Sequence, residues 1–585
     1  MKQSKKNSNA DYISVGDVVV GRVHGGKKKF RVKILNTNLT VPIRRKIGDV
    51  EQLRSWCENK TDVILKILSV KHVDMYGEII GVLDGSKISQ IILSHGVIEK
   101  FPDKVKQAAA KIETEPDEYE MSRRIDRRNL KIVTIDGEDA KDLDDGVFAE
   151  KIDGGYFLGV YIADVSHYVK NFSVLDKEAF ERGTSIYPVG RVVPMLPVEL
   201  SNGICSLNPN VNRLAMACEM KLDFSGKATS YKIFPTVIKV FRRLSYTQVN
   251  EFLDGDISEI ADCAENLNVL HEIYNLRKKI RHSRGAIDFE LPEVEIVLNK
   301  NETPVKIYKK FRGVAECIIE ECMLVANETV AEHTVKNLIP SLYRVHENPT
   351  SEKVEIFNRL LNRFGLHIPA SREIQPAQFQ KVLSQVEGNP AEKIISTFAL
   401  RTMQQARYSS KNLGHFGLAA QFYTHFTSPI RRYPDLIVHR MLKAQPEEIH
   451  KLSRRLAEIA LQSSERERRA VEIERDVLDY KSAEFMKNFI GQKFDAVISG
   501  VTNFGIFVEI ENGVEGLVHL STLKNDYYNY IENEFALIGR RTGKIFSIGD
   551  SVRVKLVRVD RSKRQIDFEL VEGVTAENLI AKVED

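Results

Sequence analysis

The sequence predicts a multidomain α+β protein in which two small β-barrels flank a larger body of mixed strands and helices. Three observations favour this class. At 585 residues the chain is too long for one hydrophobic core and is expected to hold about three or four domains. Short runs of alternating apolar residues gather near both ends, and strands alternate with long helical patterns between them. Apolar residues make up 43 % of the chain and charged residues 28 %, an ordinary composition for a globular protein.

The first barrel is expected over residues 13–87, after a disordered basic tail at residues 1–12. Five strand-like runs, separated by turn residues, occur here: DVVVGRV, KFRVKIL, LTVPI, DVILKILSV and GEIIGVL. Five short strands so close together indicate a barrel of the OB or cold-shock type. Residues 1–50 hold twelve Lys and Arg against three Asp, whereas the whole chain has a net charge of only +4. A basic module of this kind suits a protein that binds a polyanion; a solubilising surface is the alternative.

The middle of the chain is predicted to hold three parts. Residues 88–129 form a polar helical connector, and residues 130–446 form a body in which strands and helices alternate. Residues 447–489 follow as a long charged helix with one apolar stripe.

The second barrel is expected over residues 490–572, where five more strand-like runs occur, and residues 573–585 form a mildly acidic tail. Phe504, Phe507 and His519 fall on strands of this barrel. Aromatic side chains on such barrels stack on RNA bases, which is the role expected here. Core packing explains at least one of these aromatic residues.

An acidic stretch, Leu130–Val147, is the first candidate site. Its sequence is LKIVTIDGEDAKDLDDGV, in which an apolar strand is followed by four closely spaced carboxylates: Asp136, Asp142, Asp144 and Asp145. Like charges so close together need a counter-charge, and Mg²⁺ accepts carboxylates together with substrate phosphate. Two such ions would hold the attacking and leaving oxygens of a phosphodiester. A solvated acidic turn is the alternative, whereas the spacing of a Ca²⁺ loop is absent.

The second candidate site is Tyr408–His439, where aromatic and charged residues surround a loop that opens a helix at Pro434. Its chemistry-bearing side chains are His415, His425, Arg431 and Arg432. The arginine pair could bind a phosphate and stabilise developing charge, and the start of the helix would add N–H donors. Alternatively, an arginine pairs with a neighbouring carboxylate such as Asp435.

Three further acidic residues, Glu316, Glu320 and Glu321, lie on a buried-looking helix predicted within residues 311–336. Asp164 and His167 follow a predicted strand and could lie at the edge of a pocket. For these two residues a hydrogen-bonded structural role is the favoured interpretation.

The six cysteines are scattered without C-x-x-C pairs, which argues against a zinc site and a disulfide framework. A reducing cytosol is therefore the expected location. The N-terminus lacks the apolar core of a signal peptide, and no run is apolar enough to span a membrane.

Several long motifs occur in a fixed order: TIDGEDAKDLDD, YIADVSHYV, VVPMLPVELSNGICSLNP, YRVHENP, GHFGL and YTHFTSPIRRYPDLIVHR. With these motifs the chain resembles the ribonuclease II/ribonuclease R (RNB) family. HFTSPIRRYP and the Gly-Glu-Asp of the acidic motif are more similar to ribonuclease R than to ribonuclease II. The resemblance implies a cold-shock-like domain at the N-terminus, an RNB catalytic domain and an S1 RNA-binding domain at the C-terminus.

The activity that the resemblance implies is Mg²⁺-dependent hydrolysis of single-stranded RNA by a processive 3′→5′ exoribonuclease that releases nucleoside 5′-monophosphates. Two ions are expected during catalysis, with Mn²⁺ able to substitute. The expected partner is the 3′ end of a single-stranded RNA, and the chain is expected to be a monomer.

The resemblance also assigns residues by matching motifs. Asp136, Asp142 and Asp145 would bind metal, while Asp144 would act most directly in the chemistry through the second metal or the attacking water. Arg431 matches the arginine that stabilises the phosphate, and Glu474 matches a glutamate near the 3′ end. RNA contacts are implied at Tyr187, Phe289 and Arg432, with Tyr187 stacking on the terminal base and Phe289 as the weaker match.

Two departures from the ribonuclease R pattern are expected to limit duplex unwinding. Only one complete N-terminal barrel is predicted where the family usually has two, with a remnant strand of another at Val15–Val23. The Lys-rich C-terminal tail is also missing. The rival hypothesis from another class is a catalytically silent RNA-binding protein or RNA chaperone, which would be expected to lack some of the aspartates or Arg431. A DNA exonuclease with the same chemistry is a third possibility.

Overall fold

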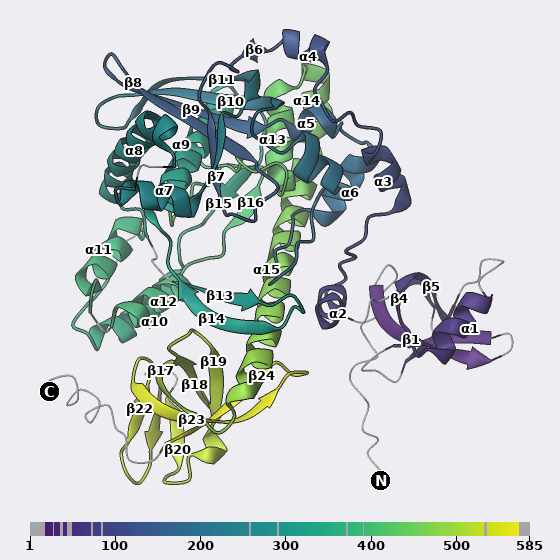
Figure 1. Ribbon diagram of the computed structural model, residues 1–585. Coiled ribbons are helices and arrows are strands. Elements are labelled where there is room, and N and C mark those ends of the chain that lie inside the picture. Colours follow the sequence, from purple (N-terminus) through teal and green to yellow (C-terminus); the bar gives the residue numbers. More distant parts are fainter. Residues whose placement is uncertain are drawn as a thin grey trace. The chain divides into compact units, whose positions relative to one another are not determined.

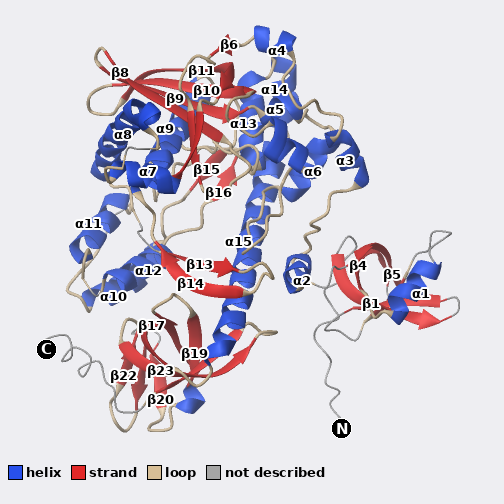
Figure 2. Cartoon of the chain, viewed as in Figure 1, coloured by secondary structure: helices blue, strands red, loops and turns tan. Residues whose placement is uncertain are grey.

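The structure is a computed structural model of the chain (Figures 1 and 2). It describes residues 18–26, 29–34, 39–43, 50–71, 74–82, 86–256, 259–288, 292–369, 373–389, 391–531 and 535–571. The chain divides into two compact units, one of residues 1–103 with 469–477 and one of residues 104–468 with 478–585.

The first unit contains a five-stranded antiparallel sheet in the order β3-β2-β1-β4-β5. Its elements are β1 (Val18–Gly26), β2 (Lys29–Ile34), β3 (Thr40–Pro42), α1 (Val50–Glu58), β4 (Asp62–Lys71), β5 (Asp74–Val82) and α2 (Lys87–Ser94). A parallel bridge between Ile43 and Gly77 joins the two ends of the sheet. The five predicted strands are present, whereas α1 was not predicted because its nine residues give a short apolar pattern. α1 contributes Leu53 to the core between the strands.

The second unit contains a seven-stranded mixed sheet in the order β12-β7-β8-β9-β10-β11-β6. Its strands are β6 (Ile125–Asp126), β7 (Val133–Asp136), β8 (Asp145–Ile152), β9 (Gly155–Ala163), β10 (Asn212–Leu222), β11 (Ala228–Lys239) and β12 (Arg242–Ser245). β7 and β8 are antiparallel neighbours, so the end of β7 lies beside the start of β8. Asp136 ends β7 and Asp145 begins β8, which places both carboxylates at one edge of the sheet.

Three helices pack near this sheet in Figure 1: α7 (Tyr246–Leu253), α8 (Ala264–Ser283) and α9 (Val314–Lys336). α8 packs on β8, and α9 packs on α8, β7 and β9. α9 has buried residues on most sides, as the sequence predicted for this helix. Shorter elements connect these parts: α3 (Asp103–Ala109), α4 (Glu118–Ser122), α5 (Val165–Tyr168), α6 (Val174–Arg182), the π-helix η1 (Glu199–Ile204) and the 3₁₀ turn η2 (Ala261–Cys263).

A separate helical cluster follows α9. It consists of α10 (Ser351–Asn362), α11 (Pro376–Val386) and α12 (Glu392–Thr402), packed around Phe357 and Phe379, whose rings stack with centroids 5.7 Å apart. Two strand pairs complete this region: β13 (Glu293–Leu298) with β14 (Pro304–Lys310), and β15 (Tyr343–Val345) with β16 (Arg407–Ser409).

The helices after the second candidate site are α13 (Tyr433–Lys443), α14 (Pro446–Ser453) and α15 (Leu456–Met486). The prediction of one long helix over residues 447–489 is wrong, since two helices are separated at Arg454 and Arg455. Leu452 and Leu456 are both buried, so the apolar stripe continues across the break and does not reveal it.

A buried carboxylate anchors α13. Asp176 accepts hydrogen bonds from the Tyr433 hydroxyl at 2.9 Å and from Arg440 Nη1 at 2.6 Å. Its second oxygen accepts a bond from the Phe172 N–H at 2.7 Å. All four charged or polar groups that meet here are therefore paired, and the start of α13 is fixed against α6.

The C-terminal region contains a closed barrel in the order β17-β18-β19-β24-β23. Its strands are β17 (Lys493–Thr502), β18 (Gly505–Ile510), β19 (Glu515–His519), β23 (Ser551–Asp560) and β24 (Gln565–Leu570), with the 3₁₀ turns η3 (Lys487–Phe489) and η4 (Leu520–Thr522). Between β19 and β23 lies a three-stranded sheet that was not predicted: β20 (Tyr528–Ile531), β21 (Ala536–Gly539) and β22 (Ile545–Ser547). Its strands are short, and their apolar alternation is weak.

The predicted multidomain α+β class, with a mixed central body and a C-terminal barrel, is confirmed. All six cysteines are unpaired in the structure. In the described part of the chain, no helix combines the length and the apolar character needed to cross a membrane.

The anchoring of α13 predicts a large loss of stability in Asp176→Ala, because this change leaves Arg440 buried without its carboxylate. Removal of one partner of a buried pair costs about 3–5 kcal/mol in the free energy of unfolding. Chemical denaturation followed by circular dichroism measures the loss. Lys177→Ala, at the exposed next position, should stay within about 0.5 kcal/mol of the original chain. Equal stability of the two variants would contradict the anchor.

Candidate active site

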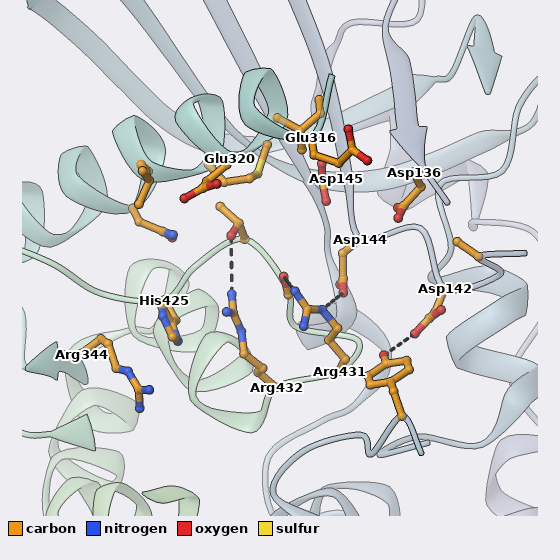
Figure 3. A pocket seen from close by; sticks show the side chains of 18 of the residues that line it. Asp136, Asp142, Asp144, Asp145, Glu316, Glu320, Arg344, His425, Arg431 and Arg432 are labelled. Carbon is orange, nitrogen blue, oxygen red and sulfur yellow. Dashed lines mark hydrogen bonds and ion pairs between the residues drawn. The ribbon is translucent and has the colours of Figure 1, made fainter. Parts of the chain in front are cut away.

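A cavity of about 900 Å³ lies between the β7–β8 loop, α9 and the segment that precedes α13 (Figure 3). Its volume lies within the range of small-molecule sites. Both candidate sites from the sequence line it, and the charged and imidazole side chains are Asp136, Asp139, Asp142, Asp144, Asp145, Glu316, Glu320, Arg344, His415, His425, Arg431 and Arg432. The structure therefore joins two regions that are nearly 300 residues apart in the chain.

The acidic loop is held in place by backbone contacts rather than by its carboxylates. The Leu143 N–H donates to Ser206 Oγ at 3.1 Å, and that hydroxyl donates to the Lys141 carbonyl at 2.8 Å. On the other side of the loop, Arg243 Nη2 donates to the Ala140 carbonyl at 2.8 Å. These contacts leave the aspartate side chains free to face the cavity.

Asp144 is the most buried of the loop carboxylates, at 3 % exposed. Its Oδ1 accepts a hydrogen bond from the Ile430 N–H at 2.8 Å, whereas its Oδ2 is buried with no hydrogen-bond partner among the described residues. Arg431 Nε lies 3.9 Å from Oδ2, too far for a hydrogen bond. Burial raises the pKa of Asp144 well above its usual range, despite the nearby Arg431.

Two more aspartates are shifted in the same direction. Burial, and then the charge of Asp136, raise the pKa of Asp145 to about 7. Burial also raises the pKa of Asp136. The fourth carboxylate, Asp142, contacts an aromatic residue, because its Oδ2 accepts a hydrogen bond from the Tyr187 hydroxyl at 2.8 Å. Burial is the main cause of all three raised pKa values, and the charge of Arg431 only partly offsets it.

The donor set fits a hard divalent cation. Within the described residues, no three His, Cys, Asp or Glu side chains are placed closely enough to hold a metal ion together. Mg²⁺ does not need such a cage, because it keeps several waters and takes one or two carboxylates plus substrate phosphate. The buried Oδ2 of Asp144 and the neighbouring Asp136 and Asp145 offer the all-oxygen ligands that this ion prefers.

The two adjacent arginines have different surroundings. Arg432 Nη2 donates to Asp435 Oδ1 at 2.7 Å, and that oxygen also accepts a bond from the Ser428 N–H at 2.8 Å. This is the pairing that the sequence left open, and it occurs at Arg432. The Arg431 side chain is 45 % exposed and donates to Ser428 Oγ at 3.2 Å, so its guanidinium can meet an incoming anion.

The segment that carries Tyr187 is tied to the arginine segment. The Ser185 N–H and the Thr184 hydroxyl donate to the Arg431 carbonyl at 2.9 and 3.0 Å. A β-bridge between Thr184 and Arg432 extends this contact. Tyr187, 40 % exposed, is thereby positioned at the cavity next to Asp142.

The structure adds residues to which the sequence assigned no role. Glu316 and Glu320 lie one turn apart on α9 and face the cavity, whereas Glu321 is buried against Arg281 at 2.6 Å. Arg344, on β15, lines the far side of the cavity together with His425 (Figure 3). The helical spacing of the glutamates was a usable signal, and Arg344 lies in the quoted motif YRVHENP, although that motif was given no role at the site.

His425 is half-buried in the wall of the cavity. Its Nδ1 and the Tyr408 hydroxyl lie 2.8 Å apart, and burial lowers the pKa of His425 well below its usual range. The imidazole is therefore neutral at neutral pH.

Asp164 is not among the residues that line this cavity. Asp164 is fully buried between Arg124 and Lys443, in the structural role favoured from the sequence. Glu474 lies on the part of α15 that belongs to the first unit. Phe289 lies outside the described residues.

The three barrel candidates come together at one end of β18 and β19. The rings of Phe504 and Phe507 are 6.0 Å apart in an edge arrangement. His519 pairs in the strand register with Gly505, the residue that follows Phe504 in the chain. Phe504 is 45 % exposed, so this end of the barrel presents an accessible aromatic surface.

Comparison with known families places both parts of the second unit. Residues 124–448 match the family described as RNB domain, and residues 487–570 match the family described as S1 RNA binding domain.

Similar proteins share one name. "Ribonuclease R 1" of Lactococcus lactis is 46 % identical over 505 residues, which cover 84 % of this chain and 62 % of that protein. "Ribonuclease R" of Thermotoga maritima is 44 % identical over 513 residues, which cover 85 % of this chain and 72 % of that protein. The solved structure of Mycoplasma genitalium RNase R in complex with ribose methylated single-stranded RNA matches with a TM-score of 0.85 at 30 % identity, covering 97 % of this chain and 93 % of that one.

The raised pKa of Asp145 predicts a pH-dependent gain of stability in Asp145→Asn. The folded chain holds this proton more tightly than an unfolded Asp does, so its stability falls as pH rises from the usual Asp value to about 7. Asn mimics the neutral carboxyl and avoids this loss. In EDTA, the advantage of the variant in free energy of unfolding should grow by on the order of 3 kcal/mol between about pH 5 and about pH 8.

Thermal and chemical unfolding across this pH range would measure the effect. Asp153→Asn, on the exposed β8–β9 turn, is the matched control and should show no such trend. An advantage of Asp145→Asn that does not change with pH would contradict the assignment.

Proposed function

The chain belongs to the RNB family of ribonucleases, in its ribonuclease R branch, and from this premise we propose that it is a Mg²⁺-dependent 3′→5′ exoribonuclease. Its substrate would be single-stranded RNA, degraded processively by hydrolysis to nucleoside 5′-monophosphates. The matched region spans less than two thirds of the Lactococcus lactis relative. The whole activity is therefore stated as a proposal for this chain.

One observation carries the proposal: the cavity places Asp136, Asp142, Asp144 and Asp145 opposite the exposed guanidinium of Arg431. A phosphodiester is the group that suits both walls. Its negative charge matches Arg431, and its oxygens complete the coordination of a cation bound to the carboxylates.

In the proposed reaction, Arg431 binds the scissile phosphate and stabilises the charge that develops on its oxygens. Mg²⁺ at the aspartates would supply activation of water and neutralisation of the leaving 3′-oxygen. Asp144 is the carboxylate assigned most directly to the chemistry, and the Ile430 N–H fixes its orientation. The paired Arg432 positions the loop that carries Arg431, through the oxygen of Asp435 that both Arg432 and the Ser428 N–H share.

The terminal nucleotide would be held by side chains that do not read its sequence. Tyr187 would stack on the last base, with Phe289 as the second aromatic residue of the clamp and Glu474 near the 3′ end. Stacking accepts every base because each has a π-face, as a processive enzyme requires.

The two barrels would guide RNA toward the cavity. In the first unit the sheet order, with a parallel bridge between its ends, supports an OB-type barrel of the cold-shock kind. In the S1 domain Phe504, Phe507 and His519 would stack on and bind the strand. We further propose a cytoplasmic, monomeric enzyme in which Mn²⁺ can substitute for Mg²⁺.

A catalytically silent RNA-binding protein is the rival function. It gains no support, because every aspartate of the acidic loop and Arg431 are present and line one cavity. A DNA exonuclease would use the same groups, and matched ribose and deoxyribose substrates distinguish the two.

The proposal predicts that Asp144→Asn abolishes turnover without abolishing RNA binding. Loss of the charge at the reacting phosphate should lower the rate on the order of 10³-fold. The measurement is a time course on 3′- and 5′-labelled single-stranded RNA with Mg²⁺ or with EDTA. Glu150→Gln, at an exposed position of β8, is the control and should retain full activity. Equal rates for Asp144→Asn and the original chain would refute the proposal.

A second prediction concerns structured RNA. The substrate is a duplex with a 3′ overhang of about ten nucleotides, a length within the range bound by OB folds. The protein should degrade the overhang and then stall where the duplex begins. A blunt duplex of the same sequence should resist degradation, because an unpaired end is needed to reach the cavity. Gel analysis of both substrates tests this, and rapid digestion of the blunt duplex would contradict it.

A further inference from the structure

The three-stranded sheet inserted in the S1 domain packs on the barrel, and one end of its β20–β21 ladder is exposed. Its residues Tyr528, Leu537 and Phe546 join the core of the barrel. Phe535, directly before β21, packs against Phe398 of the helical cluster, with ring centroids 4.6 Å apart. These contacts fix the sheet on the body of the second unit.

This exposed end of the ladder carries an aromatic residue, Tyr527, beside a group of cations. Tyr527 is 83 % exposed, and its carbonyl accepts a hydrogen bond from the Arg540 N–H at 2.9 Å, so the two residues lie opposite each other in the ladder. Arg541 follows Arg540, and Lys524 lies three residues before Tyr527, all of them exposed.

The guanidinium groups of Arg540 and Arg541, at this end of the β20–β21 ladder, bond to uncharged oxygens. Arg540 Nε donates to Asn529 Oδ1 at 2.9 Å, and Arg541 Nη2 donates to the Asn525 carbonyl at 2.8 Å. Both partners are uncharged amide oxygens. Among the residues that the structure describes, neither arginine has a carboxylate within ion-pair distance.

A carboxylate instead fixes the turn that presents the arginines. Asp526 Oδ2 accepts hydrogen bonds from the Thr542 N–H and the Thr542 hydroxyl, both at 2.6 Å. The Arg541 N–H donates to the same carboxylate at 3.1 Å. The 539–544 turn is therefore pre-organised, which lowers the entropy lost when a ligand binds to it.

We propose that Tyr527, Arg540 and Arg541 form a second contact site for single-stranded RNA, separate from the Phe504, Phe507 and His519 surface. Tyr527 stacks on a base, and the two guanidinium groups bind the adjacent phosphates. An exposed aromatic beside unpaired cations is the combination that binds single strands without sequence preference. The site rests on the proposed function for its choice of ligand, since acidic protein surfaces would match the charge but not the stacking platform.

The test measures the affinity of the full chain for a labelled single-stranded RNA of about twenty nucleotides, by fluorescence anisotropy in EDTA at several salt concentrations. The Arg540→Ala/Arg541→Ala variant should bind about tenfold more weakly near 100 mM salt. Its plot of log affinity against log salt should be shallower by about 1.4, because each phosphate contact contributes about 0.7 on single strands. Tyr527→Ala should lower affinity about tenfold, whereas Tyr527→Phe keeps the ring and should bind as the original chain does.

Lys451→Ala/Arg454→Ala removes the same charge from the exposed face of α14 and serves as the matched control, with an unchanged salt slope. Unfolding curves of all variants confirm that they fold. An unchanged affinity and slope in both the arginine and the Tyr527→Ala variants would overturn the site, as would an equal loss in the control. Degradation of the same RNA by the original chain is measured separately, with Mg²⁺. Absence of degradation would contradict the proposed function, whereas the binding data alone decide the proposed site.

Discussion

The body of this protein depends on holding several carboxylates close together in a partly buried wall, where Arg431 is the cation beside Asp144. Asp144 has a backbone N–H on one oxygen and no hydrogen bond on the other. Burial, and then the charge of Asp136, raise the pKa of Asp145. Like charges in a poorly solvated wall repel strongly. The fold tolerates this wall because the loop is secured through its backbone, at Ser206 and Arg243.

The cavity wall that carries Arg431 is stabilised by two buried ion pairs at and after the start of α13. Asp435 is fully buried and binds Arg432 together with the Ser428 N–H. One turn further along α13, Arg440 is bound by Asp176. Both arginines form buried ion pairs, and the Arg431 side chain is the more exposed of the two adjacent arginines at the cavity. Neighbouring residues of the same type thus have opposite roles.

Much of the fold was visible in the sequence because strand alternation is a local pattern. Both sets of five strands were predicted, as was the buried α9. The break between α14 and α15 was not, because Leu452 and Leu456 continue one apolar stripe across it. The inserted sheet β20–β22 was missed because its strands are only three or four residues long.

The candidate site was predictable where its residues lie close together in the sequence. The four aspartates and Arg431 belong to long motifs, and the structure places them at one cavity. Arg344 was missed, since its approach to His425 depends on the pairing of β15 with β16. The family resemblance assigned the phosphate role to Arg431, but the residues alone left open which of the two arginines pairs with Asp435.

The hydrogen bonds from Thr184 and Ser185 to the Arg431 carbonyl have a consequence for how a chain end is accepted. They join the backbone segment that carries Tyr187 to the backbone segment that carries Arg431, so the two segments move together. A terminal base that sits badly on Tyr187 would therefore shift the arginine that faces the phosphate. The positions of the last base and of the guanidinium would then depend on the same backbone contact.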